Sequence, residues 1–416
     1  MIKKIFIAAI IFCTLQVQGQ ETLKVMFYNL LEFPSASPGN RDVILRNIME
    51  EYQPDIFMVC ELESEEGANE ILNTSLTFGD FPYGRATFQP NTSSGADIQQ
   101  LIFYRADKFS LENSEIIQTT VRDINRYILQ LNTANGGSDP LDLNIYVSHL
   151  KSSQGSSNEN LRLSMVNEFT STLNTLDPDS YVIFAGDLNV YDSDEPAYQE
   201  LLDPTNDIVL KDPIELPGDW SNNISFQGIH TQSTRESSGP FGAGAGGGLD
   251  DRFDFILLSE NMLTNPRLRY VTDTYKAYGN NGNCFNQDVS ASNCTGEFSQ
   301  QIRTRLFGMS DHLPVVLELE TNEEIILSGT EFDAVIKQIK INNTLVKNKV
   351  SLDIPEVLFN EVSFTIYNTL GQKIKYISTK NSHKNLIDVS SFPEGIYYIK
   401  TNLSNNTPLK FIKTTF

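Results

Sequence analysis

Seven short apolar runs between residues 23 and 320 constrain the fold of this chain more than any other feature of its sequence. Runs of this length are typical of strands that are buried on both faces of a sheet. Strand-like and helix-like segments do not alternate regularly, so the pattern predicts a mixed α/β fold of stacked sheets with outer helices rather than a doubly wound sheet. The runs are LKVMFYN (23–29), DIFMVCEL (55–62), LIFYR (101–105), LNIYVSHL (143–150), YVIFAGDLNV (181–190), RFDFILL (252–258) and HLPVVLELE (312–320).

Two amphipathic helices are expected between these runs. Residues 41–52 have helical periodicity, with Val43 and Ile48 among the residues of the apolar face. A second helix is expected to begin at Ser156, because Ser156 and Glu159 have the spacing of a capping box.

The chain is acidic, and its charge is unevenly distributed. The net charge of the 416 residues is −22. Residues 331–416 contain 11 lysines, no arginine and 7 acidic residues, and residues 1–20 contain two lysines, which leaves −28 for residues 21–330. A protein that coats nucleic acid is usually basic, since neutralisation of phosphates supplies most of the non-specific affinity. The composition excludes such a protein but is compatible with an enzyme that handles one phosphate at a time with a metal.

The first residues are typical of a secretory signal peptide. Lys3 and Lys4 precede an apolar run, and residues 1–19 are predicted to be removed by cleavage after Gly19. No later segment approaches the ~20 apolar residues of a membrane span. We therefore expect the mature chain to be secreted or held at the cell surface, without a membrane span.

The cysteines and one glycine-rich segment predict local features of the fold. Cys284 and Cys294 bracket a stretch rich in Gly, Asn and Ser, which in an exported chain predicts a disulfide. Cys60 lies in an apolar run and is expected to be a buried thiol.

GAGAGGG (242–248) neither follows a strand nor opens a helix, so it is interpreted as a flexible loop and not as a phosphate-binding loop.

Polar residues stand where the predicted strands end. They are Asn29, Glu61, His149, Asp187, Asn189, Asp254, Ser310, Asp311 and His312. Such residues are expected to meet at one edge of the sheets. Mg²⁺ prefers carboxylate and amide oxygens, which Glu61, Asp311 and Asn29 supply; Mn²⁺ and Ca²⁺ are alternatives. The two histidines provide a general base and a donor to phosphate, whereas no G-x-S-x-G motif of a serine hydrolase is present.

Five motifs carry a family resemblance. PDIFMVCE, SHLKS, GDLN, RFDFIL and SDHLPV, in this order over residues 23–320, resemble the endonuclease/exonuclease/phosphatase superfamily. The resemblance implies a four-layer α/β sandwich at residues 20–322, with two central sheets flanked by helices, and a divalent-metal phosphodiesterase or phosphatase site.

The same resemblance implies the metal ligands. Glu61 resembles the principal ligand of the family, with Asp311 opposite it and Asn29 helping to hold metal or phosphate. The chain departs from the abasic-site endonucleases, which have an acid two residues after this asparagine. Here that position is Leu31, followed by Glu32, which argues against a role in abasic-site repair.

The remaining polar residues resemble the proton-transfer and phosphate-binding groups of the family. Asp187 and Asn189 match the pair that positions the attacking water, the phosphoryl oxygens or the leaving group. His312 resembles the general base, oriented by Asp254. His149 resembles the second histidine of the deoxyribonuclease and sphingomyelinase branches, which stabilises the pentacovalent phosphorane or assists the leaving oxygen.

The C-terminal part has a resemblance of its own. Short β-type runs predict a small all-β sandwich at residues 335–416, joined by a linker at 323–334. The segments IYNTLGQKI and GIYYIK resemble the C-terminal sorting domain of type IX secretion, whose machinery is then a partner. The usual Asn-Pro near its start is here Asn342-Asn343. The alternative is a β-sandwich that binds carbohydrate or the substrate of the enzyme.

These features favour a secreted, monomeric nuclease that cuts DNA or RNA. The alternatives are a phosphomonoesterase, a sphingomyelinase or phospholipase C-like enzyme, and an inactive binding module; the complete set of carboxylates and histidines argues against the last. The acidic body should repel DNA unless a local cationic patch compensates. The candidate patch residues are Arg85, Arg105, Lys151, Arg162, Arg235 and Arg252.

Overall fold

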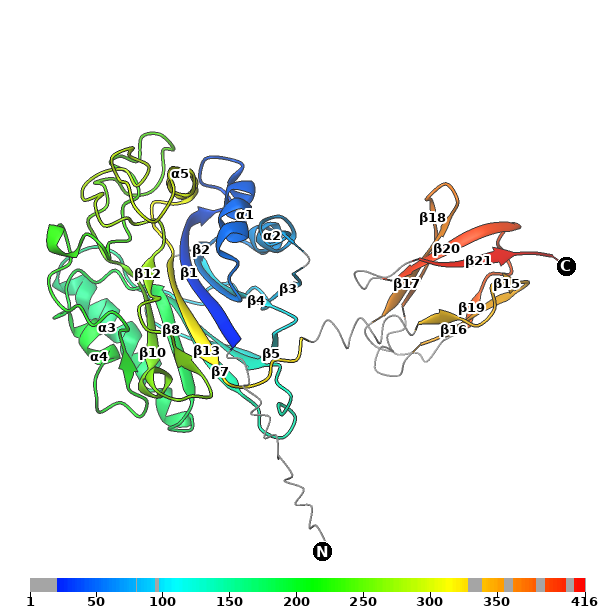
Figure 1. Ribbon diagram of the computed structural model, residues 1–416, viewed down its shortest axis with the longest axis horizontal. Coiled ribbons are helices and arrows are strands. Elements are labelled where there is room, and N and C mark those ends of the chain that lie inside the picture. The colour runs from blue at the N-terminus through cyan, green and yellow to red at the C-terminus, as the bar shows by residue number, and fades with distance from the viewer. Residues whose placement is uncertain are drawn as a thin grey trace, which may run out of the picture. The chain divides into compact units, whose positions relative to one another are not determined.

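The computed structural model describes residues 21–79, 81–93, 97–327, 339–354, 362–378, 386–401 and 408–415. The predicted signal peptide lies outside them. The chain divides into two compact units, with the boundary between Ile326 and Leu327 (Figure 1).

The first unit contains two mixed β-sheets. One has the order β11-β13-β1-β2-β4-β3, with β12 also paired to β13; the other has the order β5-β6-β7-β8-β10-β9. The strands of the first sheet are β1 (Glu21–Phe33), β2 (Ile56–Leu62), β3 (Tyr83–Arg85), β4 (Gln99–Arg105), β11 (Arg269–Tyr270), β12 (Lys276–Ala277) and β13 (Val315–Thr321). Those of the second are β5 (Phe109–Ile117), β6 (Ile124–Leu131), β7 (Asp142–His149), β8 (Tyr181–Asp187), β9 (Leu210–Lys211) and β10 (Asp254–Ser259).

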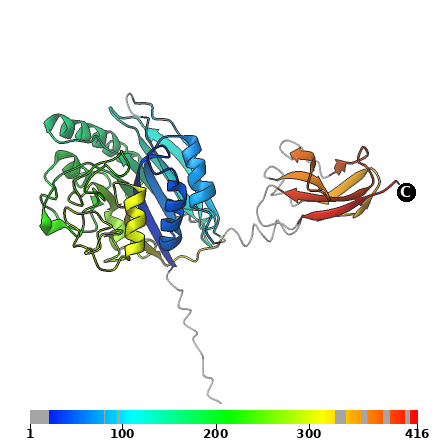
Figure 2. The same ribbon diagram turned by 90° about the horizontal axis from the view of Figure 1, so that it is seen from above.

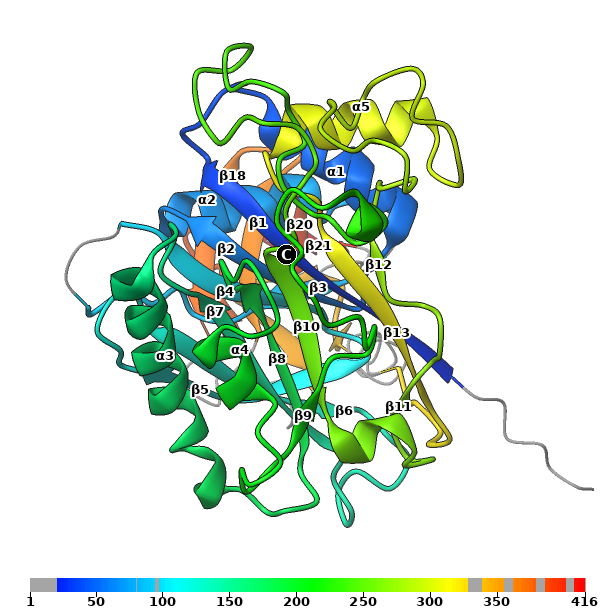
Figure 3. The ribbon, with the colours of Figure 1, turned by 90° about the vertical axis from the view of Figure 1, so that its left-hand side faces the viewer.

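Helices cover the outer face of each sheet, so the unit has four layers. The helical segments are α1 (Arg41–Tyr52), α2 (Glu65–Glu70), η1 (Ile71–Ser75), α3 (Ser156–Thr170), η2 (Leu173–Thr175), α4 (Pro196–Leu201), η3 (Ile224–Phe226), η4 (Glu260–Leu263) and α5 (Gln300–Met309). Figures 1 to 3 show α3 and α4 on one side of the stacked sheets, and α1 and α5 on the other. The predicted four-layer α/β sandwich is confirmed.

The alternating direction of side chains along the strands explains the layers. In β8, Ile183 and Ala185 belong to the core that includes the facing sheet, whereas Val182 and Phe184 pack with Phe169 of α3. Successive side chains of a strand point to opposite faces. A run that is apolar at every position therefore buries both faces of its sheet.

The two expected helices exist, but two details were wrong. In α1, Ile48 is buried as expected, but Val43 is 46% exposed, and the buried face is completed by Arg41, Leu45 and Met49. The capping box at the start of α3 is absent: Ser156 is already helical, and Gly155 holds the cap position without a side-chain hydrogen bond.

The second unit is a small all-β sandwich, as predicted. A three-stranded sheet of β14 (Lys340–Ile341), β16 (Lys349–Asp353) and β19 (Leu386–Asp388) accompanies a five-stranded sheet. The latter contains β15 (Leu345–Val346), β17 (Ser363–Asn368), β18 (Lys373–Ser378), β20 (Gly395–Thr401) and β21 (Leu409–Lys413). Its core includes Val350, Leu352, Phe364, Ile366 and Phe411.

The first residues of the expected linker are bound to the first unit. The backbone N–H of Ala134 donates to the carbonyl of Glu324 at 3.0 Å, and the N–H of Ile326 donates to that of Asn132 at 2.8 Å. Residues 323–326 thus continue the fold of that unit, and residues 328–334 of the expected linker lie outside the described residues.

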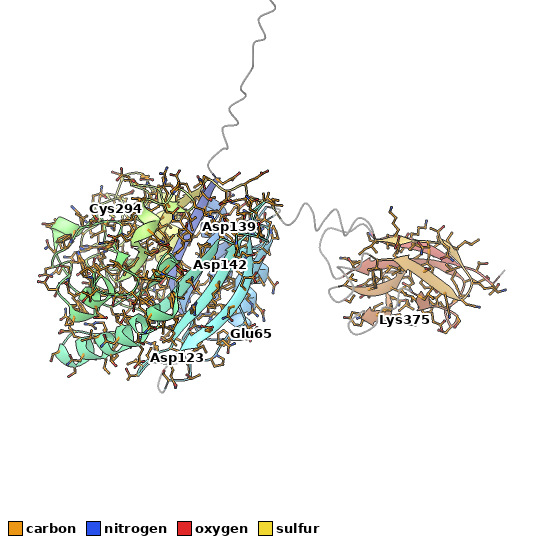
Figure 4. The ribbon with its side chains drawn as sticks, turned by 90° about the horizontal axis from the view of Figure 1, so that it is seen from below. Glu65, Asp123, Asp139, Asp142, Cys294 and Lys375 are labelled. Atoms are coloured by element: carbon orange, nitrogen blue, oxygen red, sulfur yellow. A yellow bond between two sulfur atoms is a disulfide. The ribbon has the colours of Figure 1, made fainter. Side chains whose placement is uncertain are left out.

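The predicted disulfide between Cys284 and Cys294 is present, with both residues buried and Cα atoms 5.2 Å apart (Figure 4). Cys60 is a free, buried thiol, as expected. Within the described segments, no helix combines the length and apolar character required to cross a membrane.

A buried ion pair stabilises the second sheet of the first unit. Arg252 Nη1 and Nη2 bind Asp212 Oδ2 and Oδ1 at 2.8 and 3.0 Å, and the Tyr198 hydroxyl donates to Asp212 Oδ2 at 2.8 Å. The guanidinium lies over the rings of Trp220 and Phe255, with centroid distances of 5.1 and 4.2 Å. Burial opposes ionisation of Asp212, but Arg252 outweighs it and lowers the pKa of that carboxyl.

Five of the six candidate residues for a cationic patch are engaged within the fold. Arg85 pairs with Glu65, Arg105 with Asp107, Arg162 with Glu195 and Arg252 with Asp212, while Arg235 binds the backbone carbonyls of Ala243 and Phe307. These guanidinium groups hold the fold together. Of the six, only Lys151 has no carboxylate partner or buried structural role among the described residues.

Asp212→Asn should destabilise the first unit by about 3–5 kcal/mol, because it leaves the charge of Arg252 buried and unpaired. Unfolding in urea, followed by the fluorescence of Trp220, the single tryptophan of the chain, measures this. The lowered pKa of Asp212 means that the pair contributes above the unfolded pKa of about 4, and that its contribution is lost as the pH falls further. The difference between the two proteins should therefore shrink below about pH 4.

The control is Glu297→Gln, which breaks an exposed pair with Lys276. It should cost less than about 1 kcal/mol. Equal destabilisation by the two substitutions would contradict the structural role of the buried pair.

Candidate active site

Strand direction brings the polar strand ends to one edge of the stacked sheets. β1 is parallel to β2, and β7 is parallel to β8. β13 is antiparallel to β1, and β10 is antiparallel to β8, so these two strands begin at the edge where the others end. The carboxyl ends of β1, β2, β7 and β8 therefore lie with the amino ends of β10 and β13.

Direct contacts join the residues from the two sheets. Asn29 Nδ2 donates to Glu61 Oε1 and to Asp187 Oδ2, each at 3.0 Å. His312 Nδ1 lies 2.7 Å from Asp254 Oδ2. The sheets thus meet at this edge through hydrogen bonds between acids and their polar partners.

The other predicted residues lie at the same place. His149 Nε2 is 3.5 Å from Asp187 Oδ2 and 3.9 Å from Glu61 Oε1. The backbone N–H of Asn189 donates to Asp187 Oδ1 at 3.1 Å. With Asp311 directly before His312 in the chain, the structure brings all eight predicted site residues together.

A break in strand pairing aims Glu61 into this site. The register of β1 and β2 is regular as far as the pair Asn29 and Cys60 and then shifts before Phe33 and Leu62. At the shift, Glu61 has φ 57°, a left-handed conformation that is uncommon outside glycine. Glu61 Oε2 then accepts the backbone N–H of Glu32 at 3.1 Å, whereas the side chain of Glu32 is exposed.

Two groups of side chains have the spacing of metal ligands. Glu61, His149 and Asp187 form one, and Asp187, Asp254 and His312 form the other; within each, the ligand atoms lie within 4.8 Å of one another. Asp311, a predicted ligand, belongs to neither group.

Asn29 has a different orientation from the one expected of a ligand. Its amide nitrogen, which cannot bind a cation, faces Glu61 and Asp187. Its Oδ1 accepts the backbone N–H of Leu31 at 3.0 Å. In this structure Asn29 is a hydrogen-bond donor shared by two carboxylates, and it reduces their repulsion.

Burial and neighbouring carboxylates make Glu61 and Asp187 hard to ionise. Burial raises the pKa of Glu61, and the Asp311 carboxylate adds to the effect while the hydrogen bond from Asn29 opposes it. Burial likewise raises the pKa of Asp187, where Asp254 and Glu61 add to the effect and His312 opposes it. A hard divalent cation would relieve this repulsion, and carboxylate oxygens are the ligands that such a cation prefers. The donor set therefore fits the predicted metal.

The two histidines have opposite electrostatic environments. Burial opposes a charge on His312, but Asp254 and Asp187 outweigh it and raise the pKa of His312 well above its ordinary value. Burial lowers the pKa of His149 well below that value, with Arg122, His312 and Lys151 adding to the effect. Such divergent pairs are typical of sites where two groups have different tasks in proton transfer.

Sequence analysis missed Gln232 as a member of the site. Its Nε2 is 2.6 Å from His312 Nε2 and donates to Asp311 Oδ2 at 3.3 Å. Gln232 lies in a loop between predicted elements, and no motif or spacing identifies it.

The glycine-rich segment 242–248 was also misinterpreted, although its composition was a signal. It is a loop, but its backbone is anchored against Asp311. Ala245 N–H donates to Asp311 Oδ2 at 2.6 Å, and the carbonyl of Ala245 accepts from Ser233 Oγ at 2.9 Å. Gly244 has φ 84°, and a Cβ there would lie 2.9 Å from Asp311 Cγ. Glycine is required at this position because the backbone passes so close to the carboxylate.

The comparisons with known proteins concern the two units separately. Residues 339–414 match the family described as "Secretion system C-terminal sorting domain", which confirms the resemblance predicted for the tail and indicates export. No curated protein matches the chain.

Several solved structures are similar to the chain over 72–73% of its length. A zebrafish (D. rerio) TDP2 complexed with single-strand DNA product is 17% identical, with 72% of this chain and 99% of that chain covered and a TM-score of 0.47. The human Nocturnin catalytic domain is 16% identical, with 72% and 94% covered and a TM-score of 0.44. An endonuclease/exonuclease/phosphatase family protein from Bacteroides thetaiotaomicron is 15% identical, with 73% and 99% covered and a TM-score of 0.46.

Gly244→Ala should weaken the binding of a divalent cation about 10-fold to 100-fold, because the added methyl group displaces the Asp311 carboxylate. The affinity for Mn²⁺, measured by electron paramagnetic resonance, tests this without any substrate. The matched control is Gly242→Ala: Gly242 has φ 72°, and its Cβ would meet no atom within 4 Å. Similar backbone strain without a contact to Asp311 should leave the affinity within about 2-fold of the original. Equal weakening by both variants would show that the loop acts only through its backbone strain.

Proposed function

We propose that this chain is an exported, divalent-metal-dependent phosphodiesterase that hydrolyses DNA or RNA. The observation that carries the proposal is the buried cluster in which Asn29 and two histidines join Glu61, Asp187 and Asp254 across two sheets. Carboxylates for a hard cation and histidines for proton transfer are the groups that hydrolysis of a phosphate ester requires.

The metal is assigned to Glu61 and Asp311, with Asp187 and Asn29 beside them. A bound Mg²⁺ would neutralise charge on the phosphoryl group as the reaction proceeds. Glu61 is suited to hold it, because hydrogen bonds from Asn29 and from the Glu32 backbone fix both of its oxygens. Asp311 is held by Ala245 and Gln232 through Oδ2, which leaves Oδ1 as the oxygen with weaker contacts.

Proton transfer is assigned to His312. Its Nδ1 is 2.7 Å from Asp254, which fixes the ring orientation and the tautomer. In the neutral imidazole the opposite nitrogen, Nε2, then carries the lone pair and accepts a proton from the attacking water, so His312 must first lose the proton that its raised pKa favours. The carboxamide of Gln232 lies 2.6 Å from this nitrogen, so the water must replace that contact.

The remaining residues are assigned to the phosphate and the water. Asp187 is 3.7 Å from His312 Nε2 and is bonded by Asn29, so it can orient the water toward phosphorus. His149 Nε2 lies 3.5 Å from Asp187 Oδ2, the same oxygen that faces His312, and is assigned to donate to a phosphoryl oxygen or the leaving oxygen. Asn189 is held beside them because its backbone N–H donates to the Asp187 carboxylate and its side-chain Nδ2 donates to the carbonyl of Leu150.

Glu61→Gln should lower kcat/KM on bis-p-nitrophenyl phosphate about 1,000-fold, because it removes a formal charge from the metal site. EDTA should abolish the activity of the unaltered protein, and Mg²⁺ should restore it. The control Glu66→Gln makes the same chemical change at an exposed position of α2 and should leave kcat/KM unchanged. Near-normal turnover of Glu61→Gln at low Mg²⁺ would contradict the assignment.

We further propose that the second unit directs export by type IX secretion. Its core is separate from that of the first unit, and it carries no member of the candidate active site among its described residues. A chain that ends at Ile326 should therefore remain in the cell envelope but keep the kcat/KM of the full chain after purification. Fractionation of the producing cells and a parallel kinetic assay check both parts. Loss of turnover in the shortened chain would instead favour a role of the second unit in substrate binding.

A further inference from the structure

Two cations next to His149 have no carboxylate partner among the described residues. Arg122 donates from Nη1 to the backbone carbonyls of His149 and Leu150, at 3.2 and 2.7 Å. Lys151 follows two residues after His149, and its Nζ donates to the carbonyl of Ser152 at 2.7 Å. Both side chains are partly exposed. Their positive charge is therefore not neutralised by the protein, in contrast to the guanidinium groups that pair with acids.

The backbone that carries Lys151 is held in place by a buried ion pair. Arg162 Nη1 donates to the carbonyls of Lys151 and Ser153, each at 2.9 Å. Arg162 Nε and Nη2 in turn bind Glu195 Oε2 at 2.9 and 2.7 Å. With Arg122 binding the carbonyls of the two preceding residues, the turn after β7 is fixed from both sides. Lys151 is thus presented from a rigid support beside the site.

These cations lie beside the reacting groups, because Arg122 binds the backbone carbonyl of His149 itself and Lys151 follows His149 by two residues. The chain around them has the opposite sign, with a net charge of −28 over residues 21–330. Most of this surface would repel a polyanion. Two neighbouring cations without carboxylate partners therefore provide a place where a polyanion can approach.

We propose that Arg122 and Lys151 bind the phosphate next to the scissile one, so that the substrate is a polynucleotide strand with consecutive phosphodiesters. The inference rests on the proposed function and deepens it, because it names the residues that bind a second phosphate of the nucleic-acid strand. A lipid headgroup such as that of sphingomyelin has a single phosphate and would not need this second anion site. Sequential phosphates of a strand, in contrast, place a negative charge on each side of the bond that is cut.

Three matched substrates test the second phosphate directly. TpT has one phosphodiester, and pTpT and TpTp add a terminal phosphate on the 5′ or the 3′ side; the uridine series replaces them if RNA is preferred. The unaltered protein should cleave the internal bond of at least one phosphorylated form with a kcat/KM about 10-fold higher than that of TpT. Lys151→Gln should remove most of this advantage while leaving kcat/KM on TpT within about 2-fold.

Salt dependence supplies an independent readout. With single-stranded oligo(dT), the slope of log(kcat/KM) against log[salt] should become less steep by about 0.7 in Lys151→Gln, as expected for one lost phosphate contact on a single strand. The matched control is Lys211→Gln. Lys211 lies on β9 and forms an ion pair with Glu260. That variant should change neither the slope nor the preference for pTpT or TpTp.

The outcomes separate this inference from the proposed function. Cleavage of bis-p-nitrophenyl phosphate without any preference for pTpT or TpTp would overturn the inference and leave the phosphodiesterase assignment intact. If Lys151→Gln lowered kcat/KM equally on TpT and on the phosphorylated forms, the inference would also be overturned, since Lys151 would then act only through His149. Faster hydrolysis of sphingomyelin vesicles than of oligonucleotides, sensitive to Lys151→Gln, would overturn the polynucleotide assignment. No hydrolysis of any phosphodiester with Mg²⁺, Mn²⁺ or Ca²⁺ would overturn the proposed function and the inference together.

Discussion

The close approach of buried carboxylates at the junction of two sheets is the constraint on which the rest of the structure depends. Glu61 comes from one sheet and Asp187 and Asp254 from the other, and burial together with the neighbouring carboxylates opposes the ionisation of Glu61 and Asp187. Asn29 donates to two of these acids, and His312 lies against the third. The compensation is partial, so negative charge remains at this edge. That remaining charge is what suits the site to a divalent cation, and the site exists only while both sheets keep their relative position.

Buried arginines hold the loops around this charge, although the sequence pattern suggested a substrate-binding role for several of them. Arg41 donates from Nε to the carbonyl of Met309 at 2.7 Å and from Nη1 to that of Leu31 at 2.9 Å, which joins the last turn of α5 to the end of β1. Arg162 and Arg235 bind backbone carbonyls in the same way near Lys151 and Ala243. A planar guanidinium can satisfy several carbonyls of an irregular segment at once, which a lysine cannot do with the same geometry. The rigidity of the site therefore comes from charged groups that do not face the substrate.

The errors of sequence interpretation share a cause. Gly244 was placed in a flexible loop because its segment neither follows a strand nor opens a helix, yet it is required by the approach of the backbone to Asp311. Val43 was assigned to the buried face of α1, but the packing partner of that helix selects Leu45. Gln232 contacts His312 across 80 positions of the chain, and no local pattern encodes such a contact. In each case a partner distant in sequence decides the role of the residue.

The sequence by itself determined the layered α/β architecture, the separate β-sandwich at the C-terminus, the disulfide and the set of polar residues at strand ends. These follow from periodicity, composition and spacing, which act over a few neighbouring residues. Only the tertiary structure decided that Asn29 faces two acids as a donor, that Glu61 turns inward at a shift of strand register, and that Lys151 is the one of the six candidate cations without a carboxylate partner or a buried structural role in the described part of the chain. Orientation, pairing of charges and burial depend on contacts between segments far apart in the chain, and only folding brings those segments together.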